Sequence, residues 1–148
     1  MRARMALAAA GLMLAVAGCG GGDSLSANDL RIGAGSICAA ARAQTNRIAA
    51  PSSPAGGAVF LTRGVAVLKS ERSQLKTLKP PDGLEPAWRT AMDAFSQRLA
   101  AVSAAVRDLA RGGDPVTAMK RLQQKLTPIE AREDDAWQQL EVPACVNQ

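Results

Sequence analysis

The side chains of this sequence that could do chemistry are three cysteines, one cluster of carboxylates and scattered serines. The chain of 148 residues contains no histidine. A Ser-His-Asp triad, a Cys-His dyad and a histidine-ligated metal site all need an imidazole, so these kinds of site are excluded. None of the serines lies in a Gly-x-Ser-x-Gly motif. We therefore expect no catalytic residues and no enzyme activity.

Glu130, Glu133 and Asp134 form the carboxylate cluster. Spacings of three and four residues place them on one face of a helix, as in carboxylate-bridged metal bundles. Those sites also use a Glu-x-x-His motif, and a calcium loop needs alternating carboxylates and a glycine. Neither pattern is present in the sequence, so we expect no metal and no cofactor.

Cys19 follows a segment typical of a secretory signal. Arg2 and Arg4 precede an uninterrupted apolar run, residues 5–17, and the run ends in the sequence VAGC at 16–19. This end looks like a bacterial lipobox, in which diacylglycerol is attached to the cysteine thiol before cleavage in front of it. A membrane-spanning anchor would need about 20 apolar residues, and an ordinary secretory signal needs no cysteine at this place.

The lipobox divides the chain into three parts. We expect residues 1–18 to be a lipoprotein signal peptide, residues 19–26 to be the lipidated cysteine with a flexible tether, and residues 27–148 to be one domain. Two acyl chains anchor a protein stably, so the domain should lie outside the cytoplasm on the outer face of the cell membrane. With only two Trp and two Phe, a base-stacking surface is improbable and we expect no nucleic-acid partner.

Cys38 and Cys145 are the two remaining thiols, and both lie near an end of the expected domain. Two thiols in an exported protein are usually paired. The alternative is a redox-active or metal-binding pair, but CxxC spacing is absent and no histidine is available to complete a site. We therefore expect a structural disulfide between Cys38 and Cys145.

Four segments have helical periodicity, and no strand-like alternation of any length is present. We expect the first two helices at 27–48 and 58–78, with Ser26 or Asn28 as the first N-cap. The third carries an apolar seam at spacings of three and four, and Gly112-Gly113 ends it. The fourth begins at Asp114-Pro115 and runs to Val142-Pro143, with a kink near Leu126 because Pro128 removes a backbone donor. The two seams are Trp88, Met92, Phe95, Leu99, Val102, Val106 and Leu109, and Val116, Met119, Leu122, Leu126, Ile129, Trp137 and Leu140.

Four amphipathic helices with short connections predict an all-α fold, an antiparallel up-down-up-down four-helix bundle closed by one disulfide. In this topology the end of the fourth helix lies beside the start of the first, which suits the cysteine pair. Bundle interiors also hold ligands, so Trp88, Phe95 and Trp137 are a candidate ligand pocket, although core packing is the commoner role of such residues. Glu71, the one acid between Arg31 and Lys79, is expected on a solvated turn, and the basic residues around it are a candidate face for anionic partners.

Several motifs together resemble a known group. They are Gly-Ser-Ile-Cys at 35–38, Leu-Lys-Thr-Leu-Lys-Pro-Pro at 75–81, Gly-Gly-Asp at 112–114 and Val-Pro-Ala-Cys at 142–145. The pattern is similar to that of small helical lipoproteins of high-GC actinobacteria, in which Leu-x-x-Leu-x-Pro-Pro lies between two cysteines. The resemblance implies the helical fold and the bond between the two cysteines, and it assigns no catalytic residues.

These observations predict a membrane-anchored lipoprotein that acts as a non-catalytic binding or interaction module at the cell envelope, with an envelope protein as a possible partner. The alternative is a carrier that holds a small hydrophobic ligand or lipid inside the bundle. A pocket lined by Trp88, Phe95 and Trp137 would favour the carrier, and a close-packed core with no such pocket would count against it.

Overall fold

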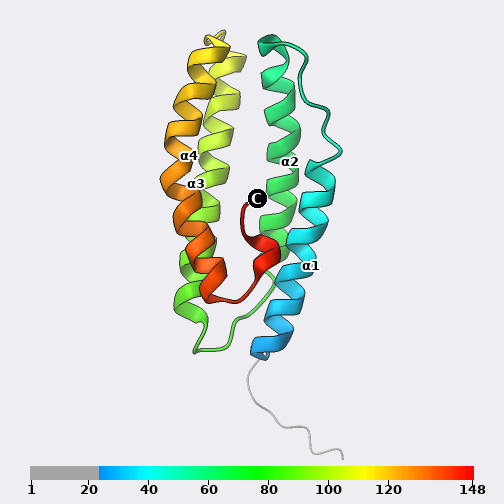
Figure 1. The fold of residues 1–148 in the computed structure, drawn as a ribbon, viewed down its shortest axis with the longest axis vertical. Coiled ribbons are helices and arrows are strands. Elements are labelled where there is room, and N and C mark those ends of the chain that lie inside the picture. Colours follow the sequence, from blue (N-terminus) through cyan, green and yellow to red (C-terminus); the bar gives the residue numbers. More distant parts are fainter. Residues whose placement is uncertain (1–23) are drawn as a thin grey trace, which may run out of the picture.

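The computed structural model describes residues 24–148, which form four packed α-helices and two short 3₁₀ helices, with no strand in this part of the chain (Figure 1). Cys19 and the expected signal peptide lie outside the described residues. The all-helical fold class is confirmed. The elements are α1 (Ala27–Thr45), η1 (Pro54–Gly56), α2 (Gly57–Leu75), α3 (Glu85–Ala110), α4 (Pro115–Gln139) and η2 (Pro143–Cys145).

The helices begin and end where local chemistry satisfies their free backbone groups. The Ser26 hydroxyl accepts a hydrogen bond from the Asp29 N–H at 3.1 Å, and the Asp114 carboxylate accepts one from the Thr117 N–H at 2.8 Å. Gly112 ends α3 with a φ of 85°, a left-handed conformation that glycine adopts without a steric penalty. α4 continues through Pro128 without interruption. None of the helices described between 24 and 148 is long and apolar enough to cross a membrane.

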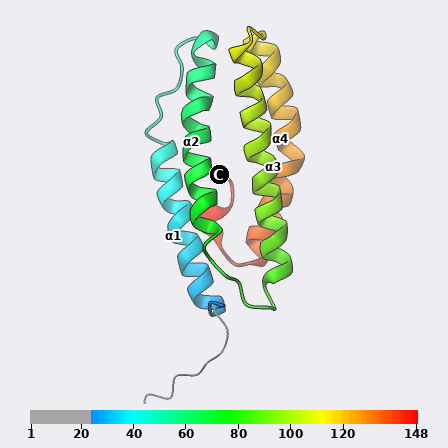
Figure 2. The same ribbon diagram turned by 180° about the vertical axis from the view of Figure 1, so that it is seen from behind.

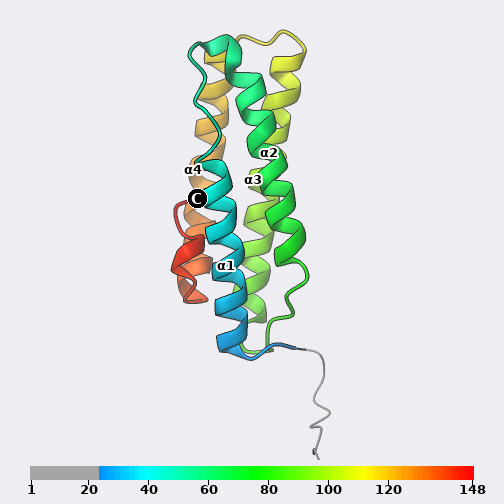
Figure 3. The same cartoon turned by 90° about the vertical axis from the view of Figure 1, so that its right-hand side faces the viewer.

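α1 and α2 are shorter than predicted, since they end at Thr45 and Leu75 and not at 48 and 78. Their last turns tighten: the Ile48 N–H bonds to the Thr45 carbonyl, and the Leu78 N–H bonds to the Leu75 carbonyl. Bonds three residues apart satisfy carbonyls at a helix end but stop the α-helix. As a result α1 covers only part of the length of α2, and residues 46–53 run on as a loop to η1 (Figure 3).

The buried faces of α3 and α4 also differ from the predicted seams. Small alanines and Arg98 replace part of the α3 seam, and Val116 and Met119 of α4 are exposed. The other seam residues of α3, which are Met92, Leu99, Val106 and Leu109, are half-buried. The buried positions of α3 are Trp88, Ala91, Ala94, Phe95, Arg98, Ala101, Val102 and Ala105.

After α4 the chain turns back on itself. Glu141 adopts a φ of 58°, and the Val142 N–H bonds to the Trp137 carbonyl at 3.0 Å, a turn that reverses the chain direction. We call residues 140–148 the C-terminal segment. It lies between α1 and α4 on the face of the bundle away from α2 and α3, so it is seen behind these two helices in Figure 2. α1 therefore packs on α2 and η2 and makes little contact with α4.

The predicted disulfide is present and holds the C-terminal segment to α1. Cys38 and Cys145 are both buried, and their Cα atoms lie 5.2 Å apart. Arg31 supports the same contact through its Nε, which donates to the Leu140 carbonyl at 3.1 Å. The bond joins residues 107 positions apart, so it removes much of the freedom of the unfolded chain.

We expect the double variant Cys38→Ser/Cys145→Ser to lose about 4–5 kcal/mol of unfolding free energy, because the unfolded chain regains the freedom of a long loop. Urea unfolding of the oxidised protein and of the variant measures this difference. Equal unfolding free energies would contradict the role given to the bond.

Candidate functional site

The three aromatic residues predicted to line a pocket come together in the core. Trp88 and Trp137 meet edge to face with ring centroids 5.6 Å apart, and Phe95 belongs to the same buried cluster as Cys38 and Cys145. All three rings are almost fully buried. The cavity of about 350 Å³ described below is lined by none of them, and Trp88 lines a separate pocket with Arg72 and Met92.

Glu133 and Asp134 of the predicted carboxylate cluster on α4 have different environments. Glu133 is buried and faces α3, whereas Asp134 accepts a hydrogen bond from the Asn147 N–H at 2.9 Å. Within residues 24–148, no group of three or more His, Cys, Asp or Glu side chains is placed to hold a metal ion.

Three charged side chains are buried at the level that separates two apolar clusters. Arg98, Glu133 and Glu71 are 6%, 3% and 2% exposed. The cluster around the disulfide lies on one side of them, and on the other side lies a second cluster that includes Leu61 and Val102. A buried charge is costly unless it is paired, so the partners of these three groups decide what the layer can do.

Arg98 and Glu133 are partners of each other. Arg98 Nη2 donates to Glu133 Oε1 at 3.0 Å, and the Nε and Oε2 atoms lie 2.9 Å apart as an ion pair. The guanidinium also lies 4.7 Å from the centroid of the Phe95 ring, and Trp137 Nε1 donates to Glu133 Oε1 at 3.4 Å. Burial raises the pKa of Glu133, and the neighbouring Arg98 opposes that shift.

Glu71 has no such partner. Its Oε1 is buried and makes no hydrogen bond. Burial raises the pKa of Glu71 from 4.5 to about 7, although the positive charge of Arg98 lowers it. The expectation that Glu71 lies on a solvated turn is wrong, because the residue sits on the inner face of α2 between Leu68 and Leu75.

A cavity of about 350 Å³ opens beside Glu71. It exists because α1 ends at Thr45 and because Gly64 of α2 has no side chain; a Cβ placed on Gly64 would meet nothing within 4 Å. One part of the wall is apolar and comes from Ile48, Phe60, Leu61, Leu68 and Val102. The polar part includes Arg42, Glu71, Arg98, Asn147 and Gln148.

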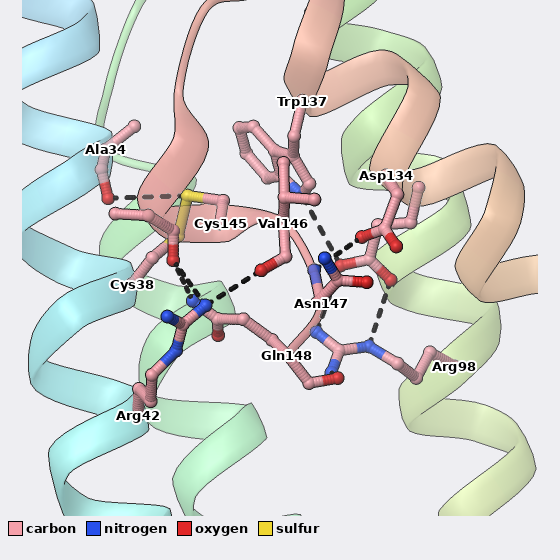
Figure 4. The surroundings of a disulfide bond; sticks show 12 residues. Ala34, Cys38, Arg42, Arg98, Asp134, Trp137, Cys145, Val146, Asn147 and Gln148 are labelled. Atoms are coloured by element: carbon pink, nitrogen blue, oxygen red, sulfur yellow. Dashed lines mark hydrogen bonds and ion pairs between the residues drawn. A yellow bond between two sulfur atoms is a disulfide. The ribbon is translucent and has the colours of Figure 1, made fainter.

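The C-terminal segment forms the remaining wall, and two arginines hold it from opposite sides (Figure 4). Arg42 Nη2 of α1 donates to the Ala144 and Val146 carbonyls at 3.2 and 2.8 Å. Arg98 Nη1 of α3 donates to the main-chain oxygen of Gln148 at 3.2 Å. Both guanidiniums around the cavity therefore have acceptors within the protein.

The same bonds bear on the predicted basic face. Arg31 and Arg42 of α1 bind carbonyls of the C-terminal segment, and Arg72 Nε of α2 donates to Ser96 Oγ at 2.9 Å. These three cations therefore serve internal contacts between elements.

A signal for the buried charges was present in the sequence. Leu61, Leu68, Glu71 and Leu75 of α2 recur at spacings of three, four and seven, so Glu71 occupies an inner position of the repeat. Arg98 likewise follows Phe95 by three residues on α3. Because charged residues were assigned to the surface by their type alone, the burial of Glu71 and Arg98 was not predicted.

Comparisons of the chain with protein-family models, with curated proteins and with solved structures found no match. The candidate site is therefore defined by its geometry alone.

We expect Glu71→Gln to stabilise the protein increasingly as the pH rises. The folded protein holds the Glu71 proton up to about pH 7, whereas the unfolded chain releases it near 4.5, so stability of the parent chain falls between these values. From pH 5 to pH 8.5 the gain of the variant should grow on the order of 2–3 kcal/mol. Urea unfolding across this range measures it, and a gain that does not change with pH would contradict the assignment.

Proposed function

We propose that this chain is a non-catalytic binding module, held at the outer face of the cell membrane by acyl chains on Cys19, and that its cavity receives a small amphiphilic molecule. The cavity beside Glu71 is the observation that carries the proposal. Ligand sites are typically concave and mostly apolar, with a few polar groups that orient the ligand. A cavity of about 150 Å³ already accepts benzene, so the volume here suits a somewhat larger ligand.

The location rests on two supports. The sequence at 1–19 has the order of charge, apolar run and lipobox expected of an exported lipoprotein. The Cys38–Cys145 disulfide is of a kind that persists in oxidising compartments. As part of the same proposal, the four helices alternate in direction as an up-down-up-down bundle. This arrangement brings the end of α4 beside the start of α1, and the C-terminal segment turns back from there to Cys38.

The surroundings of the cavity favour binding over bond-breaking. Arg42 and Arg98 are engaged with carbonyls and with Glu133, so they hold the wall in place. Glu71 has no hydrogen-bonded partner at Oε1 that would activate it as part of a catalytic pair. A fixed wall and one free acceptor suit selection of a ligand.

Filling the cavity should remove the ligand. In Gly64→Leu the added side chain points into open space, so the domain should fold while the cavity closes. Native mass spectrometry of the full chain purified from its membranes should show an added small-molecule mass on the parent protein. Its occupancy should fall at least about tenfold in Gly64→Leu.

Ala66→Leu is the matched control, because it adds the same side chain to the exposed face of α2. It should keep the ligand at the occupancy of the parent protein. Equal occupancy in the two variants, or a stoichiometric protein partner with no small molecule, would contradict the proposal and favour the interaction module.

A further inference from the structure

Glu71 Oε1 is the acceptor in the cavity wall that lacks a donor. Buried acceptors are nearly always satisfied by protein, water or ligand. The carboxylate is 2% exposed, lines the cavity and makes no hydrogen bond through Oε1. A ligand that satisfies Glu71 Oε1 must therefore carry a hydrogen-bond donor.

The charges around the cavity indicate which kind of donor. Arg98 is neutralised by Glu133 through two contacts of 2.9 and 3.0 Å. Arg42 is exposed to solvent, which screens its charge, and its Nη2 is bonded to two carbonyls. Once Arg98 and Glu133 are taken as a pair, ionised Glu71 is the buried charge left without a counter-ion.

We infer that the cavity selects a small molecule with a primary ammonium head and an apolar body, and that Glu71 is the residue that recognises the head. This inference rests on the proposed function. Phe60, Leu61, Leu68 and Val102 provide the apolar surface for the body of such a ligand. A charge-assisted hydrogen bond to a buried carboxylate is about twice as strong as a neutral one, so the ammonium head gives selectivity over an alcohol of the same length.

Binding depends on pH in a defined direction. The charged groups that act on Glu71 are Arg42 from α1, Arg98 from α3 and Glu133 from α4. The ammonium pairs with the ionised carboxylate, so a protonated Glu71 must release its proton when the ligand binds. Since the pKa of Glu71 is about 7, affinity for an ammonium ligand rises from pH 6 to pH 8, and affinity for an alcohol does not follow this change.

The test uses hexylammonium, 1-hexanol and hexanoate as probes. The full chain is placed in lipid nanodiscs, and calorimetric titrations at pH 6 and pH 8 are corrected with nanodiscs that carry Gly64→Leu. We expect hexylammonium to bind the parent protein at least about tenfold more tightly than hexanol at pH 8. Glu71→Gln should abolish this preference, and saturable binding of hexanol to this variant would show that its cavity is intact.

Equal binding of hexylammonium and hexanol, or tighter binding of hexanoate, would overturn the inference. If hexanol still binds saturably and Gly64→Leu abolishes that binding, the proposed function stands without the ammonium selectivity. If none of the probes binds, the inference fails, and the native mass measurement decides the proposed function on its own. Ala66→Leu should bind all three probes as the parent protein does.

Discussion

The Cys38–Cys145 bond is the constraint on which the rest of this structure depends. It fastens the reversed C-terminal segment to α1 at a place where a regular bundle would bring α1 against α4. Because the segment is held there, its carbonyls meet Arg42 from one side and Arg98 from the other. Part of the cavity wall is thus formed by Asn147 and Gln148, which belong to no helix. Loss of the bond would release the wall as well as lower the stability.

The buried Arg98–Glu133 pair positions neighbouring groups more than it stabilises the fold. A buried ion pair such as Arg98–Glu133 gains little over an apolar pair of the same size, because its desolvation offsets its attraction. What it does here is fix the Arg98 guanidinium, which in turn holds the Gln148 main chain. Glu71, in the same layer, has no such compensation, and burial makes it a weak acid near neutral pH. This unpaired acceptor beside a cavity is the observation from which we propose a ligand.

Much of the fold is predictable from the sequence, because it depends on local rules. Helix starts at Ser26 and Asp114, the stop at Gly112 and the pairing of Cys38 with Cys145 follow from capping chemistry and from compartment. The candidate site is less predictable. It depends on α1 ending at Thr45, on the missing side chain of Gly64 and on a chain reversal after α4. These features bring together elements that are far apart in the sequence. The periodicity within one helix does not predict such contacts.

A carbon-13 NMR titration of the Glu71 side-chain carboxyl would decide whether this residue recognises an ammonium ligand, since it observes the proposed contact itself. In the oxidised full chain in nanodiscs, the account predicts a pKa of about 7 without ligand. Saturating hexylammonium should lower this pKa clearly, because the paired cation favours the ionised form. A carboxyl that titrates near its ordinary 4.5, or a pKa that hexylammonium leaves unchanged, would contradict the account.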